Sequence, residues 1–361
     1  MEKTLLEYKC PACGGALAFD PNQQKLKCPY CDTEFETELL QQLSREEQNK
    51  PQDDMSWQQT DNCYGAQEAQ ALASYVCQSC GGELVTDVNT AATSCPYCGN
   101  PVVMSQNVTG DLRPDCIIPF KLDKQAAMDA LKKHLSGKIL LPKVFKDENH
   151  IRQIKGVYVP FWLYDAQADG NAAFRATRVR TWSDSRYFYT ETSHYRATRA
   201  GALAFSGVPV DGSSKMADEL MESIEPFDLS QAEPFQSPYL AGYYADRYDV
   251  SAQDCAPRAN DRIRTSTLQA LRDTVTGYST VTQEQGSISL SDSKIRYALY
   301  PVWLLHTRYR DTDYLFAMNG QTGKIVGDLP MDKGAYWKWW FITFAIAGAV
   351  SALVAWLAGY L

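Results

Sequence analysis

The spacing of hydrophobic positions differs between the middle of the chain and its end. Between Cys116 and Leu329, runs rich in aromatic and β-branched residues are bounded by Gly, Pro, Asn and Asp, a pattern that predicts strands. A few segments with helical spacing of apolar residues lie between these runs. Residues 105–332 are therefore expected to form an α+β domain with a mainly antiparallel sheet. The predicted strands cover 156–166, 172–182, 186–201, 296–310 and 313–328.

Three segments of this domain have the apolar spacing of amphipathic helices. In the first, Asp123 is a typical N-cap and Gly137 is a typical C-terminal stop. The second helix is expected to begin at the serine pair 213–214 and to end before Pro226. The third is expected over residues 259–275. These helices are predicted to pack against the sheet.

Two similarities indicate a possible internal duplication within the α+β domain. IIPFKLD at 117–123 resembles IEPFDLS at 224–230, and VYVPFWLY at 157–164 resembles ALYPVWLL at 298–305. Both pairs bracket a predicted helix, but the intervals between their members differ in length. The similarities therefore predict only a duplicated α+β unit.

A shorter repeat concerns arginine-rich segments. FRATR at 174–178 and YRATR at 195–199 predict two strands of one antiparallel ribbon. Six arginines lie from Arg175 to Arg199, and they could bind an anion or an acidic partner. A solvated strand face, balanced by Asp184 and Glu191, explains the same pattern and stays open as the simpler alternative.

The end of the chain is uniformly apolar. From Trp339 to Leu361 there are 23 residues without a charge, which as a helix span about 34 Å, against about 30 Å for the hydrocarbon core of a bilayer. Residues 336–361 are expected to form a single transmembrane helix, although a buried helix of a soluble protein has the same pattern. Because Lys333 and Lys338 flank only its N-terminal side, the positive-inside rule places residues 1–335 in the cytoplasm.

Small residues recur along one face of this predicted helix, at Ala347, Ser351, Ala355 and Gly359. Helices in lipid associate by close approach of their backbones, which small-xxx-small patterns permit. The face is therefore a candidate partner-binding site, either for a second copy in a homo-oligomer or for the membrane helix of another protein. Alanine and glycine are also common in membrane helices without a partner, and this explanation stays open.

Eight of the eleven cysteines form four C-x-x-C pairs. The pairs fall into two sets with the same 14-residue interval, and adding 67 to each residue number converts the first set into the second. The start of the chain has no secretory signal, so shared metal ions are expected rather than disulfides. The first set is Cys10, Cys13, Cys28 and Cys31, and the second is Cys77, Cys80, Cys95 and Cys98.

Two C-x-x-C knuckles can close a tetrahedral four-thiolate site, with glycine after a second cysteine allowing an unusual φ. Residues 1–38 and 75–104 are each expected to form a zinc ribbon with a short hairpin between its pairs, giving two zinc ions per chain. Iron also binds four thiolates, but the sequence has no other redox motif. Four protein ligands leave no open position, so the sites are expected to be structural. Cys63, Cys116 and Cys255 are expected to be ordinary thiols.

Charge helps to decide what the ribbons bind. The chain carries a formal charge of -8, and residues 1–104 carry 6 Lys and Arg against 15 Asp and Glu, a net charge of -9. Phosphate binding requires a basic surface, so protein partners are expected and no nucleic acid. Residues 39–74 are polar and acidic, and are expected to form a linker with a short helix from Glu38 to Lys50.

No motif in the sequence indicates an enzyme. The four histidines, residues 134, 150, 194 and 306, lie far apart in the sequence, and no paired-carboxylate or nucleophile motif accompanies them. NGQTGK at 319–324 lacks the spacing of a phosphate-binding loop and is expected to be a hairpin turn. An unrecognised enzyme stays open as a third alternative.

The twin ribbons and the segments VPFWLYDA, TWSDSRYFYTETSHY and YPVWLLHTRYRDTDYLFAMNGQTGKIVGDLP resemble a bacterial family of membrane proteins with TFIIB-type zinc ribbons, of the YdjG-like kind. The resemblance covers most of the chain. It implies a membrane scaffold that works with SPFH (flotillin-like) and phage-shock-type envelope-stress proteins. The replication-restart helicase label of some members is not supported, because the sequence has no nucleotide-binding motif. The expected function is a membrane-anchored cytoplasmic zinc-ribbon adaptor, and the alternative is a membrane-tethered nucleic-acid-binding regulator.

Overall fold

The computed structural model describes residues 9–21, 23–38, 52–59, 62–105, 108 and 111–359. The chain divides into two compact units. Unit 1 contains Met1–Ser56, Ala166–Phe205 and Asn260–Ser293, and unit 2 contains Trp57–Asp165, Ser206–Ala259 and Lys294–Leu361. All but the first residue of the expected helix from Glu38 to Lys50 lies outside the described residues. The domain boundaries that the sequence suggests stay predictions.

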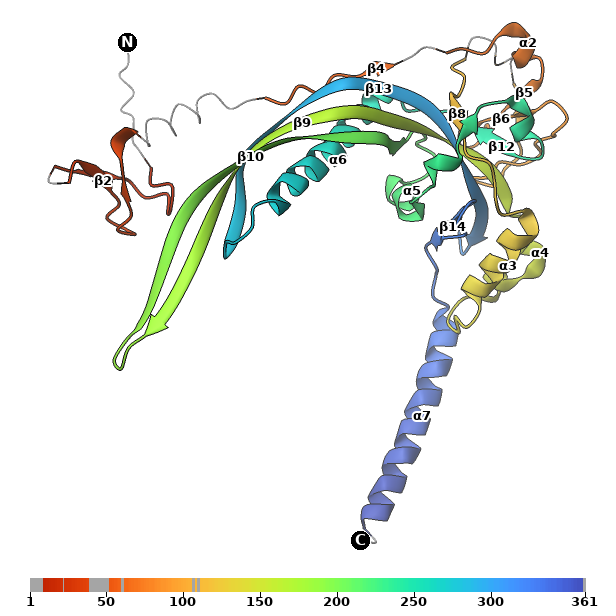
Figure 1. Cartoon of the computed structure of the whole chain (residues 1–361). Coiled ribbons are helices and arrows are strands. Elements are labelled where there is room, and N and C mark those ends of the chain that lie inside the picture. The colour runs from red at the N-terminus through yellow and green to blue at the C-terminus, as the bar shows by residue number, and fades with distance from the viewer. Residues whose placement is uncertain are drawn as a thin grey trace. The chain divides into compact units, whose positions relative to one another are not determined.

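A twelve-stranded mixed sheet is the main structural element of the protein (Figure 1). Its strand order is β11-β8-β13-β9-β12-β6-β5-β7, with β10 beside β9, β14 and β4 beside β13, and β15 beside β14. Among the described residues, strand β12 is parallel to β9, and β4 and β8 are parallel to β13, whereas pairs such as β13–β14 and β5–β6 are antiparallel. The strands are β4 (Gln58–Gln59), β5 (Leu72–Val76), β6 (Glu83–Asp87), β7 (Val103–Met104), β8 (Cys116–Ile117), β9 (Lys155–Ser183), β10 (Phe188–Asp211), β11 (Glu233–Pro234), β12 (Tyr244–Asp246), β13 (Thr280–Tyr309), β14 (Thr312–Asn319) and β15 (Ile325–Gly327).

The first part of β9 is buried on both faces, from Gly156 to Tyr164. Successive side chains of a strand point to opposite faces, so odd and even residues enter different cores. Val159 and Phe161 belong to one core, whereas Tyr158 and Trp162 belong to another. In the neighbouring strand β13, Tyr300 and Val302 belong to the first of these cores and Trp303 to a third core. Both strands are thus buried on both faces here, which explains why VPFWLY and YPVWLL are nearly continuous apolar runs.

Strand β9 is longer than its sequence pattern predicts. Residues 156–166 and 172–182 were expected to be two strands, because the intervening QADGN is polar and turn-like in composition. The structure has one continuous strand, and in this segment Ala168 and Gly170 are buried while their neighbours are exposed. The alternation of small buried and polar exposed residues keeps the segment in the sheet.

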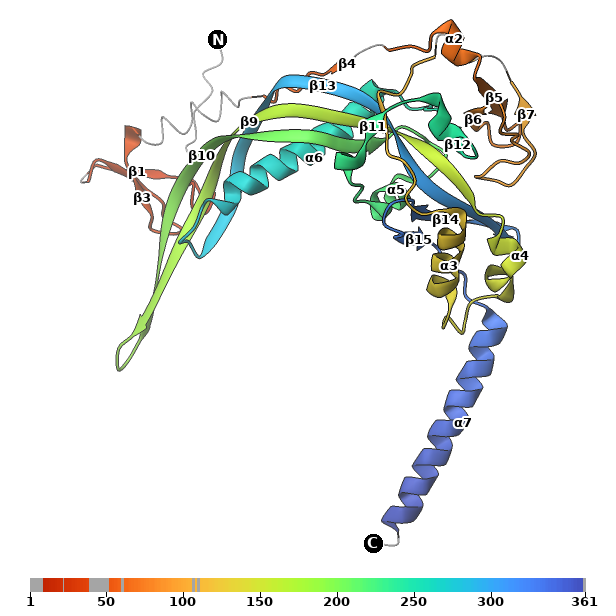
Figure 2. The ribbon, with the colours of Figure 1, turned by 45° about the vertical axis from the view of Figure 1, so that its right-hand side comes forward.

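Helix α3 (Lys124–Leu135) agrees closely with the prediction. Asp123 Oδ1 accepts a hydrogen bond from the Ala126 N–H at 2.8 Å, and Gly137 follows the helix with a φ of +74°. Figure 2 shows α3 and α4 (Glu148–Ile151) beside the β14–β15 hairpin, where they form a third core that includes Leu131 and Phe145. The remaining short helices of the described residues are α2 (Ala66–Ala69), η1 (Lys143–Lys146), η2 (Leu229–Gln231) and η3 (Ser237–Leu240).

Two other helices begin at different places than expected. Helix α5 (Asp218–Ile224) follows Ala217 rather than the serine pair, because Ser213 and Ser214 donate their hydroxyls to the carboxylates of Asp246 and Asp249. Helix α6 (Ala252–Asp273) begins at Ala252 instead of residue 259, with Pro257 in its second turn. A proline at that place argues against a helix in the sequence alone.

Unit 1 combines the first cysteine repeat with the end of β9, most of β10, the first half of β13 and most of α6. The repeat forms a separate sheet of β1 (Ala18–Asp20), β2 (Lys25–Lys27) and β3 (Glu34–Phe35). Residues 260–273 of α6 lie against β9 and β13, where a Cβ on Gly170 or Gly286 would come within 2.6 Å of a helix side chain. These glycines permit close packing of the helix on the sheet.

Helix α7 (Lys333–Ala358) ends the described chain and is long and apolar enough to cross a membrane. Residues Lys333–Trp356 include a window with a mean hydropathy of 1.7, and none of that window is buried. A soluble core helix of the same composition would be covered by other side chains. Figure 1 shows α7 without a neighbouring element along most of its length.

Candidate metal centres

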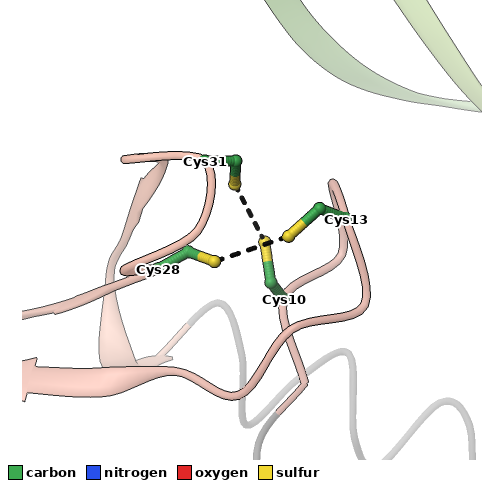
Figure 3. A group of neighbouring side chains, drawn as sticks. All are labelled: Cys10, Cys13, Cys28 and Cys31. Atoms are coloured by element: carbon green, nitrogen blue, oxygen red, sulfur yellow. Dashed lines mark hydrogen bonds between the residues drawn. The ribbon is translucent and has the colours of Figure 1, made fainter.

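The eight cysteines of the C-x-x-C pairs come together in two clusters of four, as expected. Figure 3 shows the first of them, Cys10, Cys13, Cys28 and Cys31. Within each cluster, all four Sγ atoms lie within 4.8 Å of one another. Adjacent Sγ atoms are 3.5–3.6 Å apart in both clusters. A tetrahedral ion with metal–sulfur bonds of about 2.3 Å needs sulfur atoms about 3.8 Å apart. Each cluster could therefore hold one metal ion, and four thiolates are a donor set typical of zinc.

Each C-x-x-C pair is shaped by the same backbone turn. In the first knuckle the N–H of Gly14 donates to the Cys10 carbonyl at 2.8 Å, and the other three pairs have the equivalent bond. The residue after each second cysteine has a positive φ, which is +77° at Gly14 and +56° at Asp32. Glycine adopts this conformation without steric cost, which explains its presence at three of the four positions. Asp32 is the one non-glycine residue among the four.

The two repeats differ in their sheets. In the first, the residues between the pairs form the expected hairpin, with Ala18 opposite Lys27. In the second repeat, β6 pairs instead with β5, which precedes the Cys77–Cys80 knuckle, and with β12. The expected second hairpin is therefore wrong, because partners from outside the repeat supply the hydrogen bonds. Cys77, Cys95 and Tyr97 consequently belong to a core of unit 2.

Local hydrogen bonds prepare individual thiols for metal binding. The Thr33 hydroxyl lies 3.1 Å from Cys31 Sγ and lowers the pKa of that thiol to about 6. At Cys77 burial raises the pKa, but backbone N–H groups of Cys80 and Ser79 outweigh it, and the pKa falls to about 7. Since metals bind the thiolate form, these two groups would release their protons most readily.

Cationic side chains of β9 and of the loop after β10 contact the knuckles. Lys155 Nζ donates to the Ser94 carbonyl at 2.7 Å and lies 3.4 Å from the Cys95 carbonyl. Lys215 Nζ donates to the Cys80 carbonyl at 3.2 Å. In unit 1, Arg175 donates to the Pro11 carbonyl at 2.9 Å. Four thiolates around a divalent ion leave a net charge of about -2, which nearby cations would stabilise.

A buried pair of carboxyl groups lies near the second centre, and the sequence did not indicate it. Ser213 connects the pair, since its N–H donates to Asp211 Oδ1 and its hydroxyl donates to Asp246 Oδ2. Burial raises the pKa of Asp211 to about 8 and that of Asp246 to about 7. Asp211 is therefore largely protonated at neutral pH and Asp246 is about half protonated, which reduces the cost of burying them.

The other candidate residues are not brought to a common site within the described part of the chain. Cys63 is exposed, whereas Cys116 and Cys255 are buried as free thiols. NGQTGK forms the loop between β14 and β15, where Asn319 Oδ1 accepts from the Gln321 N–H at 2.8 Å. Three residues of the predicted partner face, Ala347, Ser351 and Ala355, lie along α7 and are exposed, and Gly359 follows the helix. The role of this face stays a prediction.

Comparison with known proteins supports the expected family. No family model matches the chain. No solved structure gives a significant match. The chain is 34% identical over 335 residues to an uncharacterized protein of Bacillus subtilis (strain 168) named YdjG, and the alignment covers 93% of each chain. Identity at this level over nearly the whole length of both proteins shows that this chain belongs to the YdjG family.

Proposed function

We propose that this protein is a membrane-anchored cytoplasmic adaptor whose zinc ribbons recruit protein partners. In this proposal α7 crosses the bilayer once, residues 1–335 lie in the cytoplasm, and each cysteine cluster binds one zinc ion. One observation carries the proposal. A single chain contains two four-thiolate clusters and a 26-residue apolar helix whose most apolar segment is not buried by the rest of the protein.

The ligand set supports a structural role for the metal. Four cysteines fill every position of a tetrahedral ion, so no position is left for water or substrate. A ribbon of this size buries too little apolar surface to fold without help, and a bound ion supplies much of its folding free energy. The ion would therefore maintain a surface for binding rather than carry out a reaction.

The residues that flank α7 support the orientation. Lys333 and Lys338 lie at its N-terminal end, and lysine on that side favours the cytoplasm for the preceding residues. Trp337, Trp339 and Trp340 lie at the same end with exposed side chains, as is typical of residues at a membrane interface. A reducing cytoplasm also keeps eight thiols available for metal.

The first ribbon offers the more accessible surface for a partner. Phe19 is 51% exposed and Tyr30 is 77% exposed, although aromatic side chains usually contribute to cores. Exposed aromatic residues are enriched where proteins bind one another, and this ribbon has no basic surface that would suit nucleic acid. The family resemblance suggests an SPFH-type or phage-shock-type protein as the partner.

Co-purification of the full-length protein in mild detergent tests the adaptor proposal. The ribbon variant carries Phe19→Ser and Tyr30→Ser, and the matched control carries Val103→Ser and Met104→Ser, which are exposed apolar residues of β7. We expect an SPFH-type protein to accompany the wild type and the control, but not the ribbon variant. Zinc content should be the same in all three, which would show that the ribbon still folds.

Two outcomes would contradict the adaptor. Equal recovery of the partner with all three forms would exclude the first ribbon as the docking surface. Recovery of DNA or RNA that nuclease removes, with no protein partner, would favour the membrane-tethered nucleic-acid-binding regulator.

A further inference from the structure

We propose that the tip of the β9–β10 hairpin, residues 178–192, is a second membrane contact that binds the headgroup layer of an anionic bilayer. The inference rests on the proposed membrane attachment through α7. It assigns a role to the aromatic and arginine residues that the adaptor proposal does not use.

Four aromatic side chains gather at the tip. Phe188 is 93% exposed, and Tyr187 is 63% exposed. Trp182 and Tyr189 stack across the hairpin with ring centroids 5.5 Å apart, and both keep more than a third of their surface exposed. Such a cluster is costly in water, whereas tryptophan and tyrosine are favoured at the headgroup level of a membrane.

The turn that presents these residues is well ordered by its own hydrogen bonds. Asp184 Oδ1 accepts from the N–H groups of Arg186 and Tyr187, each at 2.7 Å. Its Oδ2 accepts from the Tyr189 hydroxyl at 2.9 Å. The acidic side chain at the tip is thus used within the turn, and Phe188 is held next to it at the start of β10.

Charge around the tip complements an anionic surface. The tip, residues 178–192, contains three arginines, one aspartate and one glutamate, so it carries +3 − 2 = +1 in a chain of net charge -8, while the flanking Arg175 and Arg196 form ion pairs with Glu284. Arg180 lies over the Trp182 ring, 5.4 Å from its centroid. Among the described residues, neither Arg180 nor Arg186 has an ion pair with a carboxylate. Both are available to lipid phosphates.

The hairpin also lacks cover from the rest of unit 1. From Arg178 to Thr192 almost every residue is exposed, so both faces of the two strands meet solvent. An isolated two-stranded hairpin is only marginally stable in water. A bilayer would bury the aromatic tip, and attachment of the same chain through α7 would keep a bilayer close at all times. These features favour lipid over a protein as the occupant.

Photo-crosslinking of the full chain in lipid nanodiscs tests the proposal. The photoreactive analogue benzoyl-phenylalanine replaces Phe188, and separate samples carry it at Met104, an exposed control on β7, or at Phe344, an apolar residue of α7. The nanodiscs contain phosphatidylcholine with a quarter of phosphatidylglycerol. We expect several-fold more lipid adduct at position 188 than at 104. Arg180→Glu with Arg186→Glu should reduce the adduct at 188 and leave that at 344 unchanged.

The possible results separate the hairpin from the anchor. If position 344 forms lipid adducts but position 188 forms no more of them than position 104, the hairpin proposal is overturned and the anchor stays in place. Protein adducts at 188 instead of lipid adducts would show that the tip binds a protein, and would also overturn it. If 344 forms no lipid adduct, the anchor fails and the hairpin proposal fails with it.

Discussion

Tyr30 and Tyr97 occupy the same position of the two cysteine repeats but have different environments. Tyr30 is 77% exposed and lies over Gly15, whereas Tyr97 is 7% exposed and belongs to a core of unit 2. The same C-P-Y-C turn therefore serves a module with a free surface in one case and a module built into a sheet in the other. The sequence repeat predicts the turn but not this difference, because the cover comes from residues far away in the chain.

Lys155 is expected to stabilise the metal at the second centre. Lys155→Met removes the Nζ group that donates to the Ser94 carbonyl, and a chelator should then take the second metal roughly tenfold faster, since outer-shell partners commonly change metal affinity by about 10- to 100-fold. Lys124→Met is the matched control, because Lys124 lines a cavity together with Lys155 and Ser94. Equal release from the two variants, followed with a chromogenic chelator, would count against the role of Lys155.

The buried carboxyl of Asp211 makes stability depend on pH. Its pKa is about 8 in the folded protein and about 4 when unfolded, so between these values the folded state holds a proton that the unfolded state has lost. Stability therefore decreases as pH rises through this window. Asp211→Asn should remove most of this decrease, which amounts to about 2.5 kcal/mol between about pH 6 and about pH 8.5.

Thermal denaturation at about pH 6 and about pH 8.5 measures this effect. The control is Asp228→Asn, because the Ser230 hydroxyl lowers the pKa of the exposed Asp228 and this carboxyl does not titrate in the window. If Asp211→Asn keeps the full pH dependence of the wild type, the buried carboxyl is not its source.

At the scale of elements, the two ribbons should differ in how they retain metal. Cys13 and Cys31 are exposed in the first ribbon, whereas Cys80 and Cys98 are partly buried in the second. The second ribbon also shares strands with the large sheet, so opening it disrupts more contacts. We expect a chelator to remove metal in two phases, the faster from the first ribbon.

Two variants assign these phases. Cys13→Ser should abolish the fast phase, and Cys80→Ser should abolish the slow phase. Release from the wild type at a single rate would contradict the difference between the ribbons. Cys63→Ser is the control, because this exposed thiol belongs to neither cluster and should leave both phases unchanged.

The small-residue face of α7 gives a prediction for the membrane helix. Replacing Ser351 and Ala355 with leucine should preserve membrane insertion, because leucine is at least as apolar, but should block close helix association. A crosslinked or co-purified complex seen with the wild type should then be lost. Leucine at Val350 and Val354 is the control. An unchanged complex would mean that α7 only anchors the protein.

Sequence patterns identified the elements whose determinants are local. The cysteine spacing predicted both clusters, and the N-cap at Asp123 predicted α3. Long-range pairing was not predictable in the same way. Strand β6 finds its partners in β5 and β12, and the polar segment 167–171 stays in β9 because Ala168 and Gly170 are buried in the sheet. The Asp211 and Asp246 pair is brought together only by the fold.

At the scale of the whole molecule, each part has a distinct task in the proposed function. We propose that the tail holds the protein at a membrane, that the sheet supports the second candidate metal centre, and that the first ribbon presents its exposed aromatic residues to a protein partner. The negative charge of residues 1–104 argues against nucleic acid as that partner. A test of the adaptor must measure both membrane attachment and metal content. Metal content alone would also fit a soluble zinc protein, and membrane attachment alone would also fit a simple anchor.

The zinc content of full-length protein extracted from the membrane fraction tests this account most directly. We expect the protein to resist washing with salt or alkali, to dissolve only in detergent, and to carry about two zinc ions per chain, one for each cluster. Recovery in the soluble fraction, a zinc content below about one per chain, or iron in place of zinc would contradict the account.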